Sequence, residues 1–272
     1  MTKKIYLDPG HGGSDPGAAG NGLKEKDLTL KISKYTRDYL RDNYESVSVR
    51  MSRTTDKTMS LRERTNDANK WKADVLVSVH INAAGSSSAT GYEDFIYNGA
   101  VQKATPSFRD AIHEEMKKVF KGFRNRGKKR ANFHMLRESR MPAVLPEFLF
   151  ITNKNDAAFL KKDSNLKLIG KHLAIGIAKH LKLKKKSTSS SSKKTNVGGG
   201  KKLYRVQIGA FSKKANADNL VKQAKSKGFK DAFVKKEGSL YKVQIGAFAV
   251  KKNADSMLKK AKNAGFKDAF IA

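Results

Sequence analysis

An internal repeat near the C-terminus constrains the fold more than any other feature of the sequence. Residues 203–234, LYRVQIGAFSKKANADNLVKQAKSKGFKDAFV, return 37 residues later as LYKVQIGAFAVKKNADSMLKKAKNAGFKDAFI, residues 240–271. Each copy has the pattern of a strand, an amphipathic helix, a glycine and a second strand. One such unit cannot bury its own apolar face, so the two are expected to fold together. The repeat therefore predicts one small ferredoxin-like α+β domain (βαββαβ) over residues 203–272.

The segment that precedes the repeat has a very different composition. Residues 182–202 contain lysine, serine and glycine in abundance and no aromatic or acidic residue. Such a composition is typical of a flexible linker. We therefore expect a separate N-terminal domain over residues 1–181, which is an ordinary domain size.

Short β-branched runs alternate with helical patterns in this N-terminal part. The strand-like runs are KIYLDPG, SVSVRMSR, DVLVSVHIN, YEDFIY, FHMLRE and AVLPEFLFI. The helical patterns cover residues 26–44, 61–72, 106–121 and 165–181. This order predicts an α/β domain with a mixed twisted sheet flanked by helices on both faces.

The chain is strongly basic, with 57 Lys and Arg against 25 Asp and Glu and a formal net charge of +32. This charge favours attraction to a polyanion, either a nucleic acid or the anionic polymers of a bacterial cell wall. Because no recognisable nucleic-acid-reading motif is present, specific nucleic-acid recognition is not expected.

The chain has no cysteine, so any metal site must use histidine and carboxylate ligands. No apolar run resembles a signal peptide or approaches the roughly 20 residues of a membrane span. We therefore expect a protein made in the cytoplasm without a signal peptide. If it acts outside the membrane, its release requires lysis, a pore or another route.

Three residues are candidate metal ligands. His11 lies in DPGHGG after the first strand, Glu25 opens the first helix, and His80 ends the most apolar strand. Taken singly, they have ordinary alternatives: an exposed turn histidine, a carboxylate at a helix N-terminus and a buried core histidine. All three, however, fall at the edge where open α/β sheets bind ligands. Two imidazoles and one carboxylate form a catalytic zinc set that leaves a fourth position for water.

Glu147 is the candidate general base, because it is the only acid in the apolar run PAVLPEFLFI. Burying a carboxylate without a partner is costly, so a functional role is expected. The alternative is a structural ion pair with an arginine or lysine.

The other histidines are weaker candidates. His113 begins HEEMK, which lacks the second histidine of an HExxH motif, and His134 has no partner motif. His172 and His180 are eight residues apart, which on a helix is about 12 Å and too far for one tetrahedral metal.

The motifs LDPGHGG, GLKEKDLTL, LRERTNDAN, VSVHINA and PAVLPEFLFITN, in this order, resemble the amidase-3 type of zinc N-acetylmuramoyl-L-alanine amidases. The resemblance covers residues 3–181. It implies hydrolysis of the amide bond between N-acetylmuramic acid and L-alanine in peptidoglycan. It also implies that His11, Glu25 and His80 bind zinc and that Glu147 is the catalytic glutamate. The chain departs from the family pattern at Leu149, where the family has glycine, and Pro146 precedes Glu147.

The C-terminal repeats look like a SPOR-type module, which implies binding to peptidoglycan glycan strands. The whole chain is similar to sporulation mother-cell lytic amidases and phage lysins of bacilli, which act at the cell wall after lysis. Candidate sugar contacts, which can instead serve the core, are Tyr204, Gln207, Phe211, Tyr241, Gln244 and Phe248.

Two other functions remain open at this point. A zinc peptidase that cuts within the stem peptide would use the same chemistry. A non-catalytic protein that binds a polyanion or the cell wall would account for the charge alone.

Overall fold

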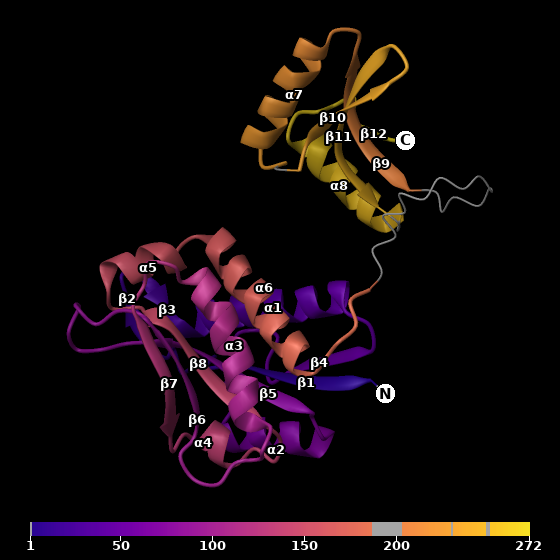
Figure 1. Cartoon of the computed structure of the whole chain (residues 1–272). Coiled ribbons are helices and arrows are strands. Elements are labelled where there is room, and N and C mark those ends of the chain that lie inside the picture. The colour runs from indigo at the N-terminus through magenta and orange to yellow at the C-terminus, as the bar shows by residue number, and fades with distance from the viewer. Residues whose placement is uncertain (1, 187–202, 230, 249–250) are drawn as a thin grey trace. The chain divides into compact units, whose positions relative to one another are not determined.

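The computed structural model describes residues 2–186, 203–229, 231–248 and 251–272 of the chain (Figure 1). The chain divides into two compact units. Most of the predicted linker, residues 187–202, lies outside the described residues. Its first residues lie against the N-terminal unit, since Glu45 N donates to Lys184 O (2.9 Å) and Lys186 N donates to Asn43 O (2.8 Å). The proposed boundaries at residues 181, 202 and 203 stay a prediction.

The N-terminal unit is built on a six-stranded sheet of order β4-β1-β5-β8-β6-β7. Its strands are β1 (Lys3–Pro9), β4 (Val47–Met51), β5 (Val75–Asn82), β6 (Tyr92–Tyr97), β7 (Asn125–Ala131) and β8 (Ala143–Phe150). The first four strands of this order are parallel, whereas β6 runs antiparallel to β8 and parallel to β7. A short hairpin, β2 (Ala19–Gly20) and β3 (Leu23–Lys24), precedes the first helix. The predicted mixed sheet is confirmed.

Helices cover both faces of this sheet (Figure 1). On one face α1 (Glu25–Asn43), α3 (Thr105–Val119) and α6 (Asp163–His180) pack on the main aliphatic core. On the other face α2 (Leu61–Trp71) and α4 (His134–Arg137) cover a smaller core around Tyr6, Leu76 and Leu145. The alternation along each strand explains the two cores, because successive side chains point to opposite faces. The short helix α5 (Lys154–Leu160) follows β8.

One local prediction in this unit is wrong, and one strand was not predicted. The segment FHMLRE, predicted as a strand, contains α4, in which the adjacent residues Met135 and Leu136 are both buried. A short apolar run does not distinguish a helical turn from a strand. The edge strand β7, with the sequence NRGKKRA, was not predicted because it lacks any apolar alternation.

The C-terminal unit contains β9 (Tyr204–Phe211), α7 (Lys214–Ser226), β10 (Phe233–Glu237), β11 (Leu240–Phe248), α8 (Lys251–Asn263) and β12 (Phe270–Ile271). Its antiparallel sheet has the order β10-β11-β9-β12. Equivalent residues of the two copies, including Val206 with Val243 and Ala217 with Ala254, meet in one core. The predicted βαββαβ domain is confirmed.

No helix of the described residues is long and apolar enough to cross a membrane.

Candidate metal centre

The carboxyl ends of parallel strands bring the predicted site residues together. His11 follows β1, His80 lies near the end of β5, and Glu147 lies in β8 as the Cα partner of His80. Glu25 is the first residue of α1, which leads back from this edge. The sheet order places β1, β5 and β8 side by side, so residues far apart in sequence become neighbours.

Glu25 lies between the two imidazoles. Its Oε2 is 3.3 Å from His11 Nε2, and its Oε1 is 3.0 Å from His80 Nδ1. The two rings are nearly perpendicular, with centroids 5.1 Å apart. One candidate ligand atom from each residue lies within 4.8 Å of the others. These three residues can therefore hold a metal ion.

The glycines of this region are needed for the close approach. A Cβ atom on Gly10 would lie 2.4 Å from His80 Cε1, and one on Gly17 would lie 2.7 Å from Glu25 Oε2. His11 itself has a φ of 62°, a left-handed conformation that turns its side chain back toward the sheet. The glycine-rich motif thus allows the imidazoles and the carboxylate to converge.

Backbone amides fix the carboxylate of Glu25. Ala18 N donates to Oε2 (2.9 Å) and Ile81 N donates to Oε1 (3.0 Å). Burial raises the pKa of Glu25, but the hydrogen bonds from His11 and His80 outweigh it and hold this pKa far below its ordinary value. Glu25 is therefore an anion that is already oriented toward both imidazoles.

Asp15 orients His11 from the other side of its ring, with Oδ2 2.8 Å from His11 Nδ1. Gly17 N in turn donates to Asp15 Oδ1 (2.9 Å). Burial lowers the pKa of His11, but Glu25 and Asp15 outweigh it and raise this pKa to about 9. A carboxylate on the far nitrogen is the usual second partner of a metal-binding histidine, and it leaves Nε2 for the ligand.

Glu147 lies half-buried beside His11, Glu25 and His80, which we call the metal group, and its Oε2 is buried without a partner. Burial raises the pKa of its carboxyl to about 7, although the charge of His80 opposes this shift. Among the described residues, Oε2 has no hydrogen-bond partner, and no lysine or arginine forms an ion pair with Glu147. The alternative of a structural ion pair therefore finds no support.

A buried ion pair beneath the site was not predicted. Asp8 accepts hydrogen bonds from Arg64 Nη1 (2.8 Å), Ser52 Oγ (2.6 Å) and Ser78 Oγ (2.7 Å). Arg64 Nη2 also donates to His11 O (2.7 Å). The pair thereby fixes the loop that carries His11. The only signal in the sequence is an arginine within the polar helix LRERTNDAN.

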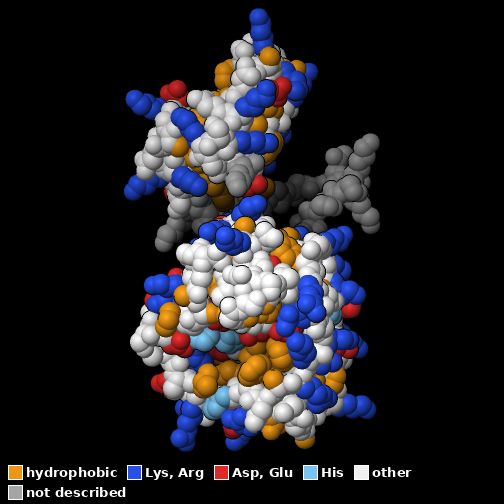
Figure 2. Space-filling view, turned by 90° about the vertical axis from the view of Figure 1, so that its left-hand side faces the viewer, with side chains coloured by type: hydrophobic (Ala, Val, Ile, Leu, Met, Phe, Trp, Pro, Cys, Tyr) orange, Lys and Arg blue, Asp and Glu red, His pale blue; other side chains and the backbone are white. Residues whose placement is uncertain are grey.

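A hollow opens beside these residues, with histidine atoms at its edge and hydrophobic atoms on its floor (Figure 2). Its volume is about 300 Å³. It is lined by Asp8, Gly10, His11, Asp15, Met59, Ser60, Leu61, Arg64 and His80.

The other histidines have structural partners. His113 Nδ1 is 2.6 Å from Asp94 Oδ2, and His172 Nδ1 is 2.8 Å from Glu115 Oε2. The ring of His180 packs on a phenylalanine, and His134 Nε2 lies 3.4 Å from a threonine hydroxyl. Within the described residues, none joins a group that can bind a metal.

Leu149 has the backbone conformation of a glycine. Its φ is 66°, and the register between β5 and β8 shifts at this point, where one residue of β5, Ile81, faces two of β8, Phe148 and Leu149. This is a β-bulge, a feature that re-aims side chains beside active sites. Leu149 therefore has a left-handed conformation that glycine adopts without strain.

The predicted sugar-contact residues of the C-terminal unit line its sheet. Gln207 and Gln244 are buried Cα partners on β9 and β11. The aromatic residues are half-buried and pack against the core; they are Tyr204, Phe211, Tyr241 and Phe248. Their contact with sugars stays a prediction.

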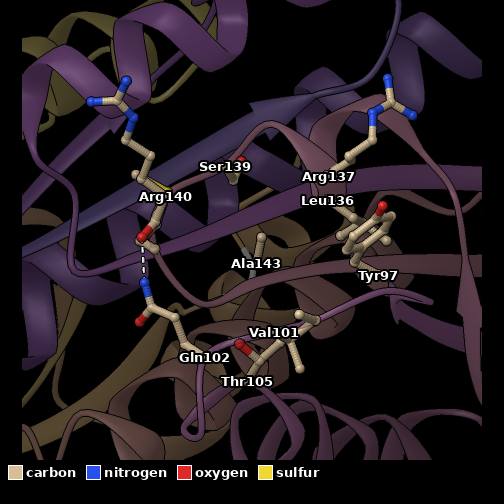
Figure 3. Close-up of a pocket in the computed structure, with 11 residues that line it drawn as sticks. Tyr97, Val101, Gln102, Thr105, Leu136, Arg137, Ser139, Arg140 and Ala143 are labelled. Carbon is tan, nitrogen blue, oxygen red and sulfur yellow. Dashed lines mark hydrogen bonds between the residues drawn. The ribbon is translucent and has the colours of Figure 1, made fainter.

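A second pocket, of about 120 Å³, lies at the other end of the strands of the N-terminal unit, away from the metal group (Figure 3). Tyr97, at the end of β6, and Ala143, at the start of β8, line it. Gln102 Nε2 donates to Arg140 O across its mouth. Its lining residues include no histidine or carboxylate, so it is separate from the metal group.

Comparisons with known proteins agree with this geometry. The model of the N-acetylmuramoyl-L-alanine amidase family (amidase-3) matches residues 5–179, and that of the SPOR domain matches residues 200–272. The chain is 50% identical over 231 residues to N-acetylmuramoyl-L-alanine amidase CwlM of Bacillus licheniformis, covering 85% of this chain and 84% of that protein. It is 48% identical over 234 residues to a sporulation-specific N-acetylmuramoyl-L-alanine amidase of Bacillus subtilis, covering 86% and 85%.

Further similarities extend to a phage protein and to a solved structure. The endolysin of Bacillus phage SPP1 is 46% identical over 195 residues, covering 69% of each chain. The catalytic domain of the amidase CwlV from Bacillus (Paenibacillus) polymyxa superposes with a TM-score of 0.63 at 31% identity, covering 67% of this chain and all of that domain. This chain therefore belongs to the N-acetylmuramoyl-L-alanine amidase family.

Proposed function

We propose that this amidase uses a zinc ion, held by His11, Glu25 and His80, to hydrolyse the bond between N-acetylmuramic acid and L-alanine in peptidoglycan. Glu147 is the proton-transfer residue. The observation that carries the proposal is the convergence of three ligand atoms within 4.8 Å beside the carboxylate of Glu147, whose Oε2 is buried and has no hydrogen-bond partner among the described residues. Cell-wall lysis is the expected consequence.

The donor set fits zinc. Imidazole nitrogen and carboxylate oxygen bind Zn²⁺ at about 2.0–2.2 Å, and three protein ligands leave one coordination position for the reaction. When bound, zinc polarises the scissile carbonyl and lowers the pKa of water to about 7. The pKa of His11, raised to about 9 without metal, means that zinc competes with protons at this site.

The chain's own residues supply orientation and proton transfer. Glu147 accepts a proton from the attacking water and delivers it to the leaving amine of L-alanine. A carboxyl group with a pKa of about 7 can do both near neutral pH. Asp15 orients the imidazole of His11, and Arg64 donates to His11 O and so fixes the loop that carries this histidine.

The C-terminal domain keeps the enzyme on its substrate. SPOR and amidase domains together imply binding to peptidoglycan, and we assign the SPOR domain to the glycan strands. The division is a catalytic domain over residues 1–181, a linker over 182–202 and a wall-binding domain over 203–272. Because two similar proteins are a sporulation-specific amidase and an endolysin, we place the action at the cell wall after lysis.

Digestion of purified peptidoglycan tests this function. The released peptides are sequenced by mass spectrometry after labelling of new amino termini. New termini at L-alanine alone support the amidase, and termini within the stem peptide identify a zinc peptidase instead. Absence of any new terminus with zinc-loaded protein contradicts the proposal and supports a non-catalytic wall-binding protein.

A further inference from the structure

The sheet face that carries the metal group continues across two more strands. His80 is the Cα partner of Glu147, and Glu147 is the Cα partner of Glu93 on β6. Paired residues of neighbouring strands point to the same face, and the strands are about 4.8 Å apart. The three side chains therefore form one row, which leads from the metal group toward the edge strand β7.

A basic cluster ends this row. The carboxylate of Glu93 is buried and accepts hydrogen bonds from Arg126 Nε (3.1 Å) and Asn82 Nδ2 (2.6 Å). Lys129 Nζ forms an ion pair with the same carboxylate. Two cations thus face one anion, which leaves an excess positive charge beside Glu147.

Donor groups of this cluster remain accessible. The side chains of Arg126 and Lys129 are 26% and 38% exposed. Within the described residues, Arg126 donates only through Nε, so its two Nη groups are available to a ligand. An arginine that served Glu93 alone would not need to present this end of the guanidinium to solvent.

Two β-bulges orient the cluster. In β7 the register with β6 shifts near Gly127, whose φ is 85°, and this extra residue brings Arg126 and Lys129 onto one face. In β8 the bulge at Leu149 brings Phe150 onto this face, where its ring centroid lies 4.9 Å from Arg126 Cζ. Both bulges therefore fix the guanidinium on the face of the metal group.

We propose that Arg126 and Lys129 form a subsite that binds a carboxylate of the peptide released by cleavage. The proposal rests on the amidase function given above and adds a determinant of substrate preference. Guanidinium and ammonium groups bind carboxylates through charge-assisted hydrogen bonds. The cationic groups meet Glu93 on β6, one strand spacing from β8, and their backbone on β7 lies two spacings from β8, so the subsite is about 5–10 Å from Glu147. Since an extended peptide rises about 3.3–3.6 Å per residue, this distance corresponds to the second or third residue after the cut bond.

Paired synthetic substrates test the subsite. Each pair consists of two muramoyl peptides that differ at one residue, which bears a carboxylate in one peptide and a carboxamide in the other. One pair differs at the second residue and the other pair at the third. With the full-length zinc-loaded enzyme, we expect kcat/KM to favour the carboxylate form of one pair by about tenfold, or about 1.4 kcal/mol. The preference should fall toward one in Arg126→Gln and in Lys129→Met.

Lys128→Met is the matched control. Lys128 neighbours Lys129 on the same strand, but it points to the opposite face, where its Nζ is 3.1 Å from Asp110 Oδ1 of α3. The Lys128→Met substitution removes the same charge as Lys129→Met and should leave the preference for the carboxylate substrate unchanged. An equal loss in both lysine variants would indicate a general charge effect and overturn the subsite.

A measurement on the wild-type enzyme tests the subsite without requiring that the variants fold. An ionic preference must shrink as salt rises, because salt screens partly exposed charges. Equal kcat/KM for both members of every pair, or a preference that salt leaves unchanged, overturns the proposal. If zinc-loaded wild type cuts peptidoglycan but shows no preference, only the subsite fails; if it cuts neither peptidoglycan nor any muramoyl peptide, the amidase function fails as well.

Discussion

Leu149 provides a direct test of the bulge beside the carboxylate of Glu147. Its side chain is 0% exposed in the main core, yet its φ is 66°. Truncation of a buried leucine to alanine costs about 2–5 kcal/mol, and Leu149→Ala should lose this amount without relieving the backbone. Leu149→Gly loses slightly more side chain but relieves a left-handed conformation worth about 1–2 kcal/mol.

The order of these two variants is therefore expected to be reversed. At an ordinary strand position, glycine is less stable than alanine by about 0.5–1 kcal/mol. At Leu149 the relief of the left-handed conformation should exceed that cost. Leu149→Gly should therefore be the more stable variant, with a free energy of unfolding about 0.5–1 kcal/mol higher than that of Leu149→Ala. Leu145, buried in the same strand without positive φ, is the control at which alanine should be the more stable.

Urea unfolding followed by tryptophan fluorescence measures this difference. The chain has one tryptophan, Trp71, and it packs in the N-terminal unit, so its signal reports on that unit. If Leu149→Gly is less stable than Leu149→Ala by the same amount as at Leu145, then the left-handed bulge does not exist and the orientation of Phe150 has no basis.

Three further predictions concern the site. Glu147→Gln should retain zinc but lower kcat by about 10²–10⁴-fold; metal analysis with turnover on peptidoglycan checks both, and full activity would exclude proton transfer by Glu147. Asp8→Asn should leave Arg64 buried without its counter-charge and cost about 3–5 kcal/mol in urea unfolding, whereas a cost below 1 kcal/mol would contradict the role of the pair. Burial raises the pKa of Asp8, but Arg64 outweighs it and the folded pKa is lower than the ordinary 3.8. The stabilisation by this ion pair is therefore fully present above pH 3.8 and is lost as pH falls toward the folded pKa. The free energy of unfolding of the wild type should fall over that range, and in Asp8→Asn this component of the fall should be absent. Chelation of the metal should abolish turnover, and added zinc should restore it; turnover that persists in metal-free protein would contradict a metal-dependent reaction.

Most of the candidate site could be predicted from the sequence, because its chemically reactive residues lie at the ends of regular elements. His11 follows β1, Glu25 begins α1 and His80 lies near the end of β5, and parallel strands bring such positions to one edge. Glu147 stood out because an acid interrupts an apolar run. The structure brings these four residues together, and their roles as metal ligands and as proton-transfer residue stay proposals.

Features that depend on local backbone conformation could not be predicted from the sequence. The basic cluster on β7 looks like an ordinary charged segment, because its shared face depends on the bulge at Gly127. A one-residue insertion reverses which side chains share a face, so period-two patterns cannot identify it. The helix α4 was mistaken for a strand for a related reason: tertiary packing buries two adjacent residues there.

Anomalous diffraction at the zinc edge, from crystals of the zinc-loaded enzyme, tests the central claim most directly. We predict one strong peak in the N-terminal unit, about 2.0–2.2 Å from a nitrogen of His11, a nitrogen of His80 and an oxygen of Glu25. A peak bound instead by His113, His134, His172 or His180, or no peak near Glu25, would contradict the account.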